Sequence, residues 1–185
     1  FLKKNKSKKI FYGDEWTLKR VKNKRIYLDK KGALILKSSN IFSDGIWQNV
    51  GLAIKVARDL NIPDKIILKT IPKISFEGRL QYVKKGKLKK LLNKKEKLLI
   101  DGCHSETSAI NLSSYLQTLN DDIYAIWGMQ KNKQPELFIK HFKNKFKNIV
   151  AIKIPEEANS CAPRDLMKIA HLNGFKCDVE KDIES

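Results

Sequence analysis

The sequence predicts an α/β protein whose C-terminal half contains a parallel sheet, and two observations lead to this prediction. After residue 97, short apolar runs alternate with segments of about a dozen residues that have helical periodicity, in the order βαβαβα. The runs are apolar on both faces, which is typical of strands buried between helices with right-handed crossovers. A lysine-rich segment at 75–97 precedes this half, so we expect a second domain before it.

In the N-terminal part, the sequence predicts a small sheet followed by helices. Its first 44 residues are rich in lysine and contain short alternating runs at 9–13, 25–29 and 32–39. A turn sequence, DKKGA, joins the last two runs and predicts a β-hairpin or small meander. Residues 46–61 have the apolar spacing of a helix with a broad buried face, and a short helix or extended piece is expected over 64–72.

The elements of the C-terminal part begin after a lysine-rich segment, 75–97, which we interpret as a connection and a solvated surface hairpin. Strands are expected at 97–101, 123–129 and 148–154, and helices at 107–119, 134–146 and 162–175. Ser105 or Thr107 is expected to cap the first of these helices, and Gly174 to end the last one.

Composition narrows the class of protein. The net charge is +18, but only five of the 38 basic residues are arginines, so we interpret most lysines as solvated surface. No apolar run approaches the roughly 20 residues of a membrane span, and no secretory signal follows the basic start. Three cysteines, at 103, 161 and 177, lack CxxC spacing, which indicates thiols in a reducing compartment and a cytoplasmic location.

The most specific stretch is Asp-Gly-Cys-His at 101–104, where an expected strand turns into a helix. Ligands of open parallel sheets bind beyond the carboxyl ends of strands, and the first N–H groups of a helix favour anions. Asp101 could accept hydrogen bonds from a ribose or orient a cation, and His104 could donate to a phosphate or a developing negative charge. The alternative is an ordinary strand-to-helix turn with an idle histidine.

Five separated motifs then occur in one order: "NVGLAI" (49–54), "GRLQ" (78–81), "LLIDGCHSETSA" (98–109), "AIWGMQKNK" (125–133) and "IPEEANSCAPRDLMKIAHLNGF" (154–175). Together they resemble folylpolyglutamate synthase/dihydrofolate synthase, of the Mur-ligase-like superfamily, from about residue 11 onward. The resemblance implies that 1–77 is the end of the central ATPase domain. It also implies that 78–185 is a Rossmann-like C-terminal domain, incomplete at its end.

The same resemblance implies an ATP-dependent ligase of folate biosynthesis that adds L-glutamate to folate or dihydropteroate. Mg-ATP phosphorylates a carboxylate in such enzymes, and the glutamate amine attacks the resulting acyl phosphate. By their places in the motifs, Asn49, Arg79 and Asp101 are expected to contact ATP. His104 is the expected catalytic residue, near the reacting groups. The resemblance also implies that the intact enzyme is a monomer. Its expected partners are small molecules, and neither a membrane nor nucleic acid is expected among them.

The chain also departs from the family pattern. No GxxxxGK[ST] phosphate loop occurs, and the Mg²⁺ ligands are expected upstream of the residues present. Ser105-Glu106 stands where the family has Asn-Pro, and Asn132 where it has Asp. We therefore expect a fragment or decayed form that cannot catalyse ligation alone. The alternatives are a non-catalytic interaction domain with an exposed apolar patch, and a lysine-rich nucleic-acid-binding module.

Overall fold

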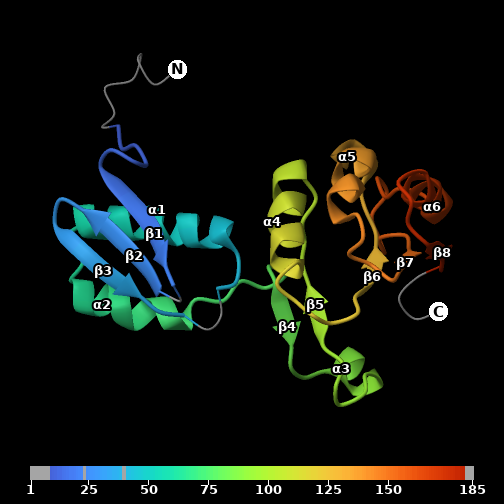
Figure 1. The fold of residues 1–185 in the computed structure, drawn as a ribbon, viewed down its shortest axis with the longest axis horizontal. Helices are drawn as coiled ribbons and strands as arrows, with labels where there is room; N and C mark the ends of the chain where they lie inside the picture. The colour runs from blue at the N-terminus through green and yellow to red at the C-terminus, as the bar shows by residue number, and fades with distance from the viewer. Residues whose placement is uncertain (1–8, 23, 39–40, 182–185) are drawn as a thin grey trace. The chain divides into compact units, whose positions relative to one another are not determined.

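The chain has a mixed α/β fold that divides into two compact units, Phe1–Leu80 and Gln81–Ser185 (Figure 1). The computed structural model describes residues 9–22, 24–38 and 41–181. The predicted fold class is confirmed. The first unit ends close to the boundary expected at residue 77, and the assignment of the two units to the two family domains stays a prediction.

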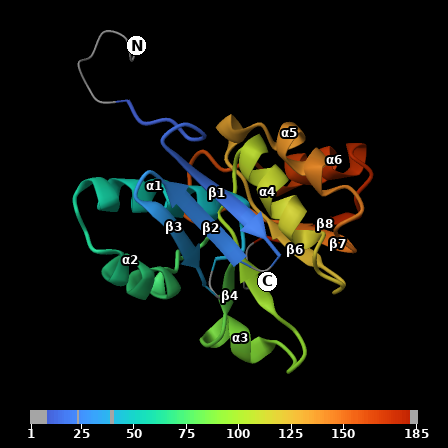
Figure 2. The same ribbon diagram turned by 60° about the vertical axis from the view of Figure 1, so that its left-hand side comes forward.

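The first unit is an antiparallel meander with helices on one of its faces (Figure 2). Its strands are β1 (Trp16–Val21), β2 (Lys24–Asp29) and β3 (Gly32–Leu36). Its helices are α1 (Asp44–Asp59), α2 (Asp64–Thr70) and the 3-10 turn η1 (Ile71–Lys73). The expected meander and helices are confirmed, but the first strand lies at 16–21 and not at 9–13. Of β1 only Trp16 is buried, so its apolar pattern is weak and pairing with β2 defines the strand.

The core of this unit forms where the sheet meets α1. Alternate residues of β3, Leu34 and Leu36, are buried, as expected for a sheet with one covered face. Gly51 of α1 leaves room for the indole of Trp16, because a Cβ at Gly51 would lie 2.4 Å from Trp16 Cζ3. Ser43 caps α1 by accepting the N–H of Ile46, which fixes the start of the helix.

The second unit contains a parallel sheet and a separate antiparallel ribbon. Its strands are β4 (Gln81–Val83), β5 (Leu98–Ile100), β6 (Tyr124–Trp127), β7 (Asn148–Ala151) and β8 (Cys177–Val179). Its helices are α3 (Lys87–Leu91), α4 (Glu106–Leu116), η2 (Lys131–Lys133), α5 (Pro135–Ile139), η3 (Lys140–Phe142) and α6 (Pro163–Leu172). The parallel sheet has the order β6-β7-β8, which confirms the predicted parallel topology.

The strands β5 and β8 differ from the prediction, and the helix expected over 134–146 is two short pieces, α5 and η3. We expected β5 to be buried and to open the parallel sheet. It is instead half-exposed and pairs antiparallel with β4, from Gln81 opposite Ile100 to Val83 opposite Leu98. The third parallel strand is β8, which was not predicted because three residues carry too little periodicity.

The core of the second unit joins the parallel sheet to the helices that follow its strands. Trp127 of β6 stacks on Phe138, with ring centroids 6.1 Å apart, and Phe138 contacts Phe142 at 5.1 Å. Trp127 is thus part of the core of this unit. In the part of the chain that the structure describes, no helix has both the length and the apolar character needed to cross a membrane.

Candidate functional site

The Asp-Gly-Cys-His stretch forms a closed turn between β5 and α4. Asp101 Oδ1 accepts the backbone N–H of Cys103 at 2.8 Å, so the carboxylate of Asp101 holds the turn in shape. The side chain of His104 is exposed, and its Nδ1 lies 3.0 Å from the carbonyl oxygen of Gly102. Since a carbonyl only accepts, Nδ1 carries the proton in this contact. The ring presents Nε2 for any other partner.

A capping box occupies the start of α4. Ser105 is the N-cap, as predicted, and its Oγ accepts the N–H of Ser108 at 3.3 Å. Ser108 Oγ in turn accepts the N–H groups of His104, at 3.2 Å, and of Ser105, at 3.0 Å. Both groups are already hydrogen-bonded within the cap.

Next to this turn lies a pocket of about 240 Å³ within the second unit. It is lined by His104, Ser105, Glu106, Asn132, Lys133, Gln134 and Leu137. These residues come from the first turn of α4, from η2 after β6, and from α5. The pocket joins two of the motifs recognised in the sequence, and Asp101 is not among the residues that line it.

The acidic residue of the pocket is held by a neighbouring turn. Glu106 Oε1 lies 2.8 Å from Lys140 Nζ and 3.0 Å from His141 Nε2, both on η3. These two partners, Lys140 first, hold the pKa of the Glu106 carboxyl below its usual range. The sequence interpretation missed Glu106, Lys133 and their surroundings. Lys133 could have been found from the sequence, because it is the last residue of the "AIWGMQKNK" motif.

The other two predicted site residues belong to the first unit. Asn49 is exposed on α1. Arg79 is exposed in a tight turn, where its N–H donates to the carbonyl of Phe76 at 3.3 Å and Gly78 has a φ of 64°. The structure brings Asp101 and His104 together in one turn of the second unit. The roles assigned to all four residues remain predictions.

The described residues offer no metal centre. Nowhere among them do three His, Cys, Asp or Glu side chains come close enough together to hold an ion. The part of the chain that the structure describes therefore does not fit a resident metal ion.

The two units define a class of fold: a three-stranded antiparallel sheet with helices, followed by an α/β unit with a parallel sheet. No family model matches the chain, and no curated protein sequence matches it. Several solved structures, however, match the chain. Escherichia coli FolC in complex with DHPP and ADP is 17% identical with a TM-score of 0.74, covering 94% of this chain and 39% of that one.

Two further structures are of the same kind. Mycobacterium tuberculosis folylpolyglutamate synthase complexed with ADP and AMPPCP is 12% identical with a TM-score of 0.77, over 94% of this chain and 40% of that one. A bifunctional folylpolyglutamate synthase/dihydrofolate synthase with Mn, AMPPNP and L-glutamate bound is 17% identical with a TM-score of 0.73, over 94% and 39%.

The chain spans about 39% of the length of the folylpolyglutamate synthases that it matches. Its fold is that of the C-terminal portion of folylpolyglutamate synthase, which confirms the resemblance seen in the sequence. At sequence identities of 12% to 17%, these comparisons show a shared fold.

Proposed function

We propose that this chain is part of an ATP-dependent ligase of the folylpolyglutamate synthase/dihydrofolate synthase type, which adds L-glutamate to folate or dihydropteroate. One observation carries the proposal. The Asp101–His104 turn borders a pocket of about 240 Å³ in a fold shared with folylpolyglutamate synthases. The ligands bound in those solved structures include ADP, DHPP and L-glutamate, which are the kinds of molecule that the proposed reaction uses.

His104 is the residue that we assign to the reacting groups. With Nδ1–H directed at Gly102, the neutral ring has Nε2 as a proton acceptor, and protonation turns the same atom into a donor to an anion. Formation of an amide by an amine requires both proton removal and stabilisation of developing negative charge. Asp101 supports His104 by holding the turn. Asn49 and Arg79 are assigned to the nucleotide, whose Mg²⁺ ligands are expected in an upstream portion.

Ligand contact at this turn is the first prediction. Nuclear magnetic resonance titrations of the chain with L-glutamate and, separately, with AMPPNP should shift the backbone amides of residues 101–106. His104→Ala should weaken the binding of at least one ligand about tenfold, the cost of losing one charge-assisted hydrogen bond. The matched control is His171→Ala on α6, an exposed histidine that does not line the pocket and should leave the affinity unchanged. Absence of any shift at 101–106 with both ligands would refute the proposed function.

Inactivity of the chain by itself is the second prediction. The 185 residues contain no glycine-rich phosphate loop, and phosphoryl transfer depends on backbone N–H groups and a lysine of that loop. Incubation with Mg-ATP, L-glutamate and either folate or dihydropteroate should therefore yield no glutamylated product by mass spectrometry. A single added glutamyl residue would contradict this prediction while leaving the ligase class intact.

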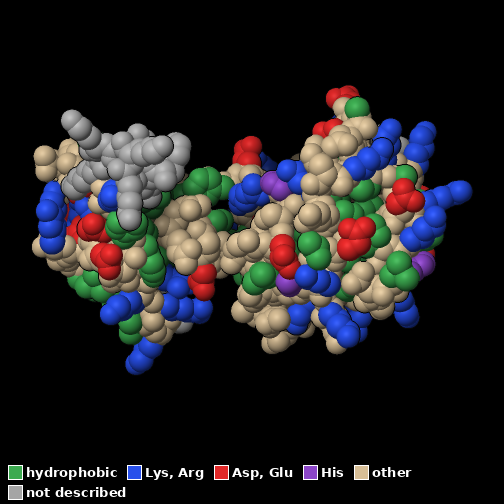
Figure 3. Space-filling model, turned by 90° about the horizontal axis from the view of Figure 1, so that it is seen from above, with side chains coloured by type: hydrophobic (Ala, Val, Ile, Leu, Met, Phe, Trp, Pro, Cys, Tyr) green, Lys and Arg blue, Asp and Glu red, His purple; other side chains and the backbone are tan. Residues whose placement is uncertain are grey.

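A non-catalytic interaction domain is the second candidate, because α1 has an exposed apolar stripe. Leu52, Val56 and Leu60 follow one another at four-residue spacing and are 48%, 47% and 70% exposed. If interaction is the only function, Leu52→Ser with Val56→Ser should abolish association with a partner while ligand titrations of the wild type show nothing. On the face shown in Figure 3, acidic side chains lie between the basic ones over both units, which does not favour a nucleic-acid-binding module.

A further inference from the structure

The charges of the pocket are unevenly compensated. Its lining contains Glu106 and Lys133. Glu106 is engaged by Lys140 and His141, which stand outside the lining on η3. Lys133 is half-buried, and among the described residues no ion pair is found for it. A small molecule that enters the pocket therefore meets the ammonium of Lys133, which is not paired with a carboxylate of the described residues.

The turn that follows Lys133 has an unusual backbone conformation. Lys133 ends η2, and Gln134 follows with φ 50° and ψ 66°, a left-handed conformation that residues other than glycine rarely adopt. Pro135 then begins α5, and a proline disfavours the right-handed helical region for the residue before it. The turn is thus held in one unusual backbone conformation at the rim of the pocket.

A second loop braces the same turn from behind. Gln130 Nε2 donates to Glu157 Oε2 at 2.7 Å, and the N–H of Lys131 donates to the carbonyl of Asn159 at 2.9 Å. Glu157 Oε1 also accepts the N–H of Asn159 at 2.8 Å. These bonds join the loop after β6 to the loop after β7, although the two are separated by a helix and a strand in the sequence. The Gln130–Glu157 pair therefore sets the position of the turn that ends in Lys133.

We propose that Lys133 Nζ binds an anionic group of the small molecule in this pocket, a carboxylate or a phosphate, and that the Gln130–Glu157 pair positions the turn. This inference rests on the proposed function, whose reactants offer both chemistries: the carboxylates of L-glutamate and the phosphates of a nucleotide. An ammonium donating to a carboxylate or phosphate makes one of the stronger hydrogen bonds in proteins. His104, which also lines the pocket, is left for the reacting end of the same molecule.

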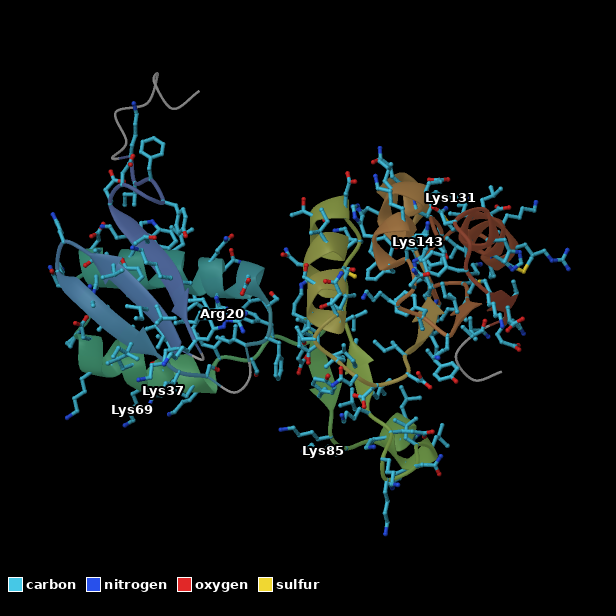
Figure 4. The ribbon with its side chains drawn as sticks, viewed as in Figure 1. Arg20, Lys37, Lys69, Lys85, Lys131 and Lys143 are labelled. Atoms are coloured by element: carbon cyan, nitrogen blue, oxygen red, sulfur yellow. The ribbon has the colours of Figure 1, made fainter. Side chains whose placement is uncertain are left out.

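The test is calorimetric titration of the full chain with L-glutamate and, separately, with inorganic phosphate. Lys133→Gln keeps most of the side-chain length and removes the charge. Its matched control is Lys131→Gln on the same turn (Lys131 is labelled in Figure 4). This variant changes the net charge equally, and Lys131 is not among the residues that line the pocket. We expect Lys133→Gln to weaken one of the two probes about tenfold to a hundredfold, and Lys131→Gln to change it less than about twofold. The probe that is weakened identifies the source of the anion.

The positioning pair has its own readout. Gln130→Glu places a second carboxylate against Glu157 and should weaken the same probe, because like charges push the turn away. Adding Glu157→Gln restores an amide–carboxylate pair with the partners exchanged, and affinity should return. A role confined to general stability would not give this rescue at equal melting temperature.

The outcomes separate the two proposals. If the wild type binds neither probe and the amides of 101–106 do not shift with AMPPNP, the proposed function and this inference both fail. If the wild type binds and Lys133→Gln binds equally well, or no more weakly than Lys131→Gln, only the assignment of Lys133 is overturned.

Discussion

Arg58 is the residue on which the first unit depends most. Its side chain is 2% exposed, as is that of Asp29, to which Nη1 donates at 2.6 Å. Nε and Nη2 donate to the two oxygens of Asp64 at 2.9 Å each, and Nη1 also donates to the carbonyl of Gly32. One side chain at the end of α1 thus connects the β2–β3 turn to the start of α2. A buried charge persists only when it is paired in this way.

Replacing Arg58 by Met should be strongly destabilising, because Asp29 would keep its buried charge without a cation. We expect a loss of about 3–5 kcal/mol in the free energy of unfolding of the first unit. Urea titration followed by tryptophan fluorescence measures this quantity. Arg20→Met, at an exposed position of β1 in the same unit, is the matched control and should stay within about 0.5 kcal/mol. Equal effects of the two variants would mean that the ion network is not what holds these elements.

At the scale of elements, α4 is attached to η3 at two places. Glu106 in the first turn of α4 pairs with Lys140 and His141, and Ser113 Oγ donates to the carbonyl of His141 at 2.6 Å. Glu106 also lies where the positive end of the helix dipole favours a carboxylate. The contact at Glu106 depends on charge and that at Ser113 does not, so only the first should respond to pH.

The stabilisation by Glu106 should disappear in acid. Because its pKa is lowered by folding, its contribution is present above the unfolded value of about 4.3 and is lost as the pH falls through the folded value. Glu106→Gln should therefore lower the melting temperature of the second unit at pH 6, and the difference from the wild type should shrink toward pH 3. Scanning calorimetry across this range measures it. Glu180→Gln, an exposed acid after β8, should show no such convergence, and a constant difference for Glu106→Gln would disprove the charge dependence.

For the whole molecule, the notable property is that each unit has its own core. One cluster of buried side chains is built around Trp16, Tyr27 and Trp47, and another around Trp127, Phe138 and Leu166. A separate core of this kind is the usual mark of an independently cooperative unit. The chain should therefore not melt as one piece.

Calorimetry of the intact chain should resolve two transitions. Leu166→Ala removes a fully buried side chain of the second unit and should cost about 2–5 kcal/mol there, lowering one transition only. Arg58→Met should lower the other. A single transition that both substitutions shift would show that the chain unfolds as one cooperative system.

Helix α3, and the division of residues 134–146 into α5 and η3, were not predicted. The sequence was enough to predict the fold class, the helices α1, α4 and α6, and the turn that unites Asp101 with His104. These features are local: apolar periodicity defines α1 and α6, and four consecutive residues lie together in any fold. The order of two parallel strands could also be inferred, since apolar runs separated by helices leave few arrangements.

Contacts between residues that are far apart in the sequence became visible only in the folded structure. It paired β5 with β4, added β8 to the parallel sheet, and closed the pocket from residues 104–106 and 132–137. It also joined Glu106 to His141 and Gln130 to Glu157, which are 35 and 27 residues apart. No periodicity encodes such contacts, because they depend on how whole elements pack and on where side chains reach once the backbone is in place.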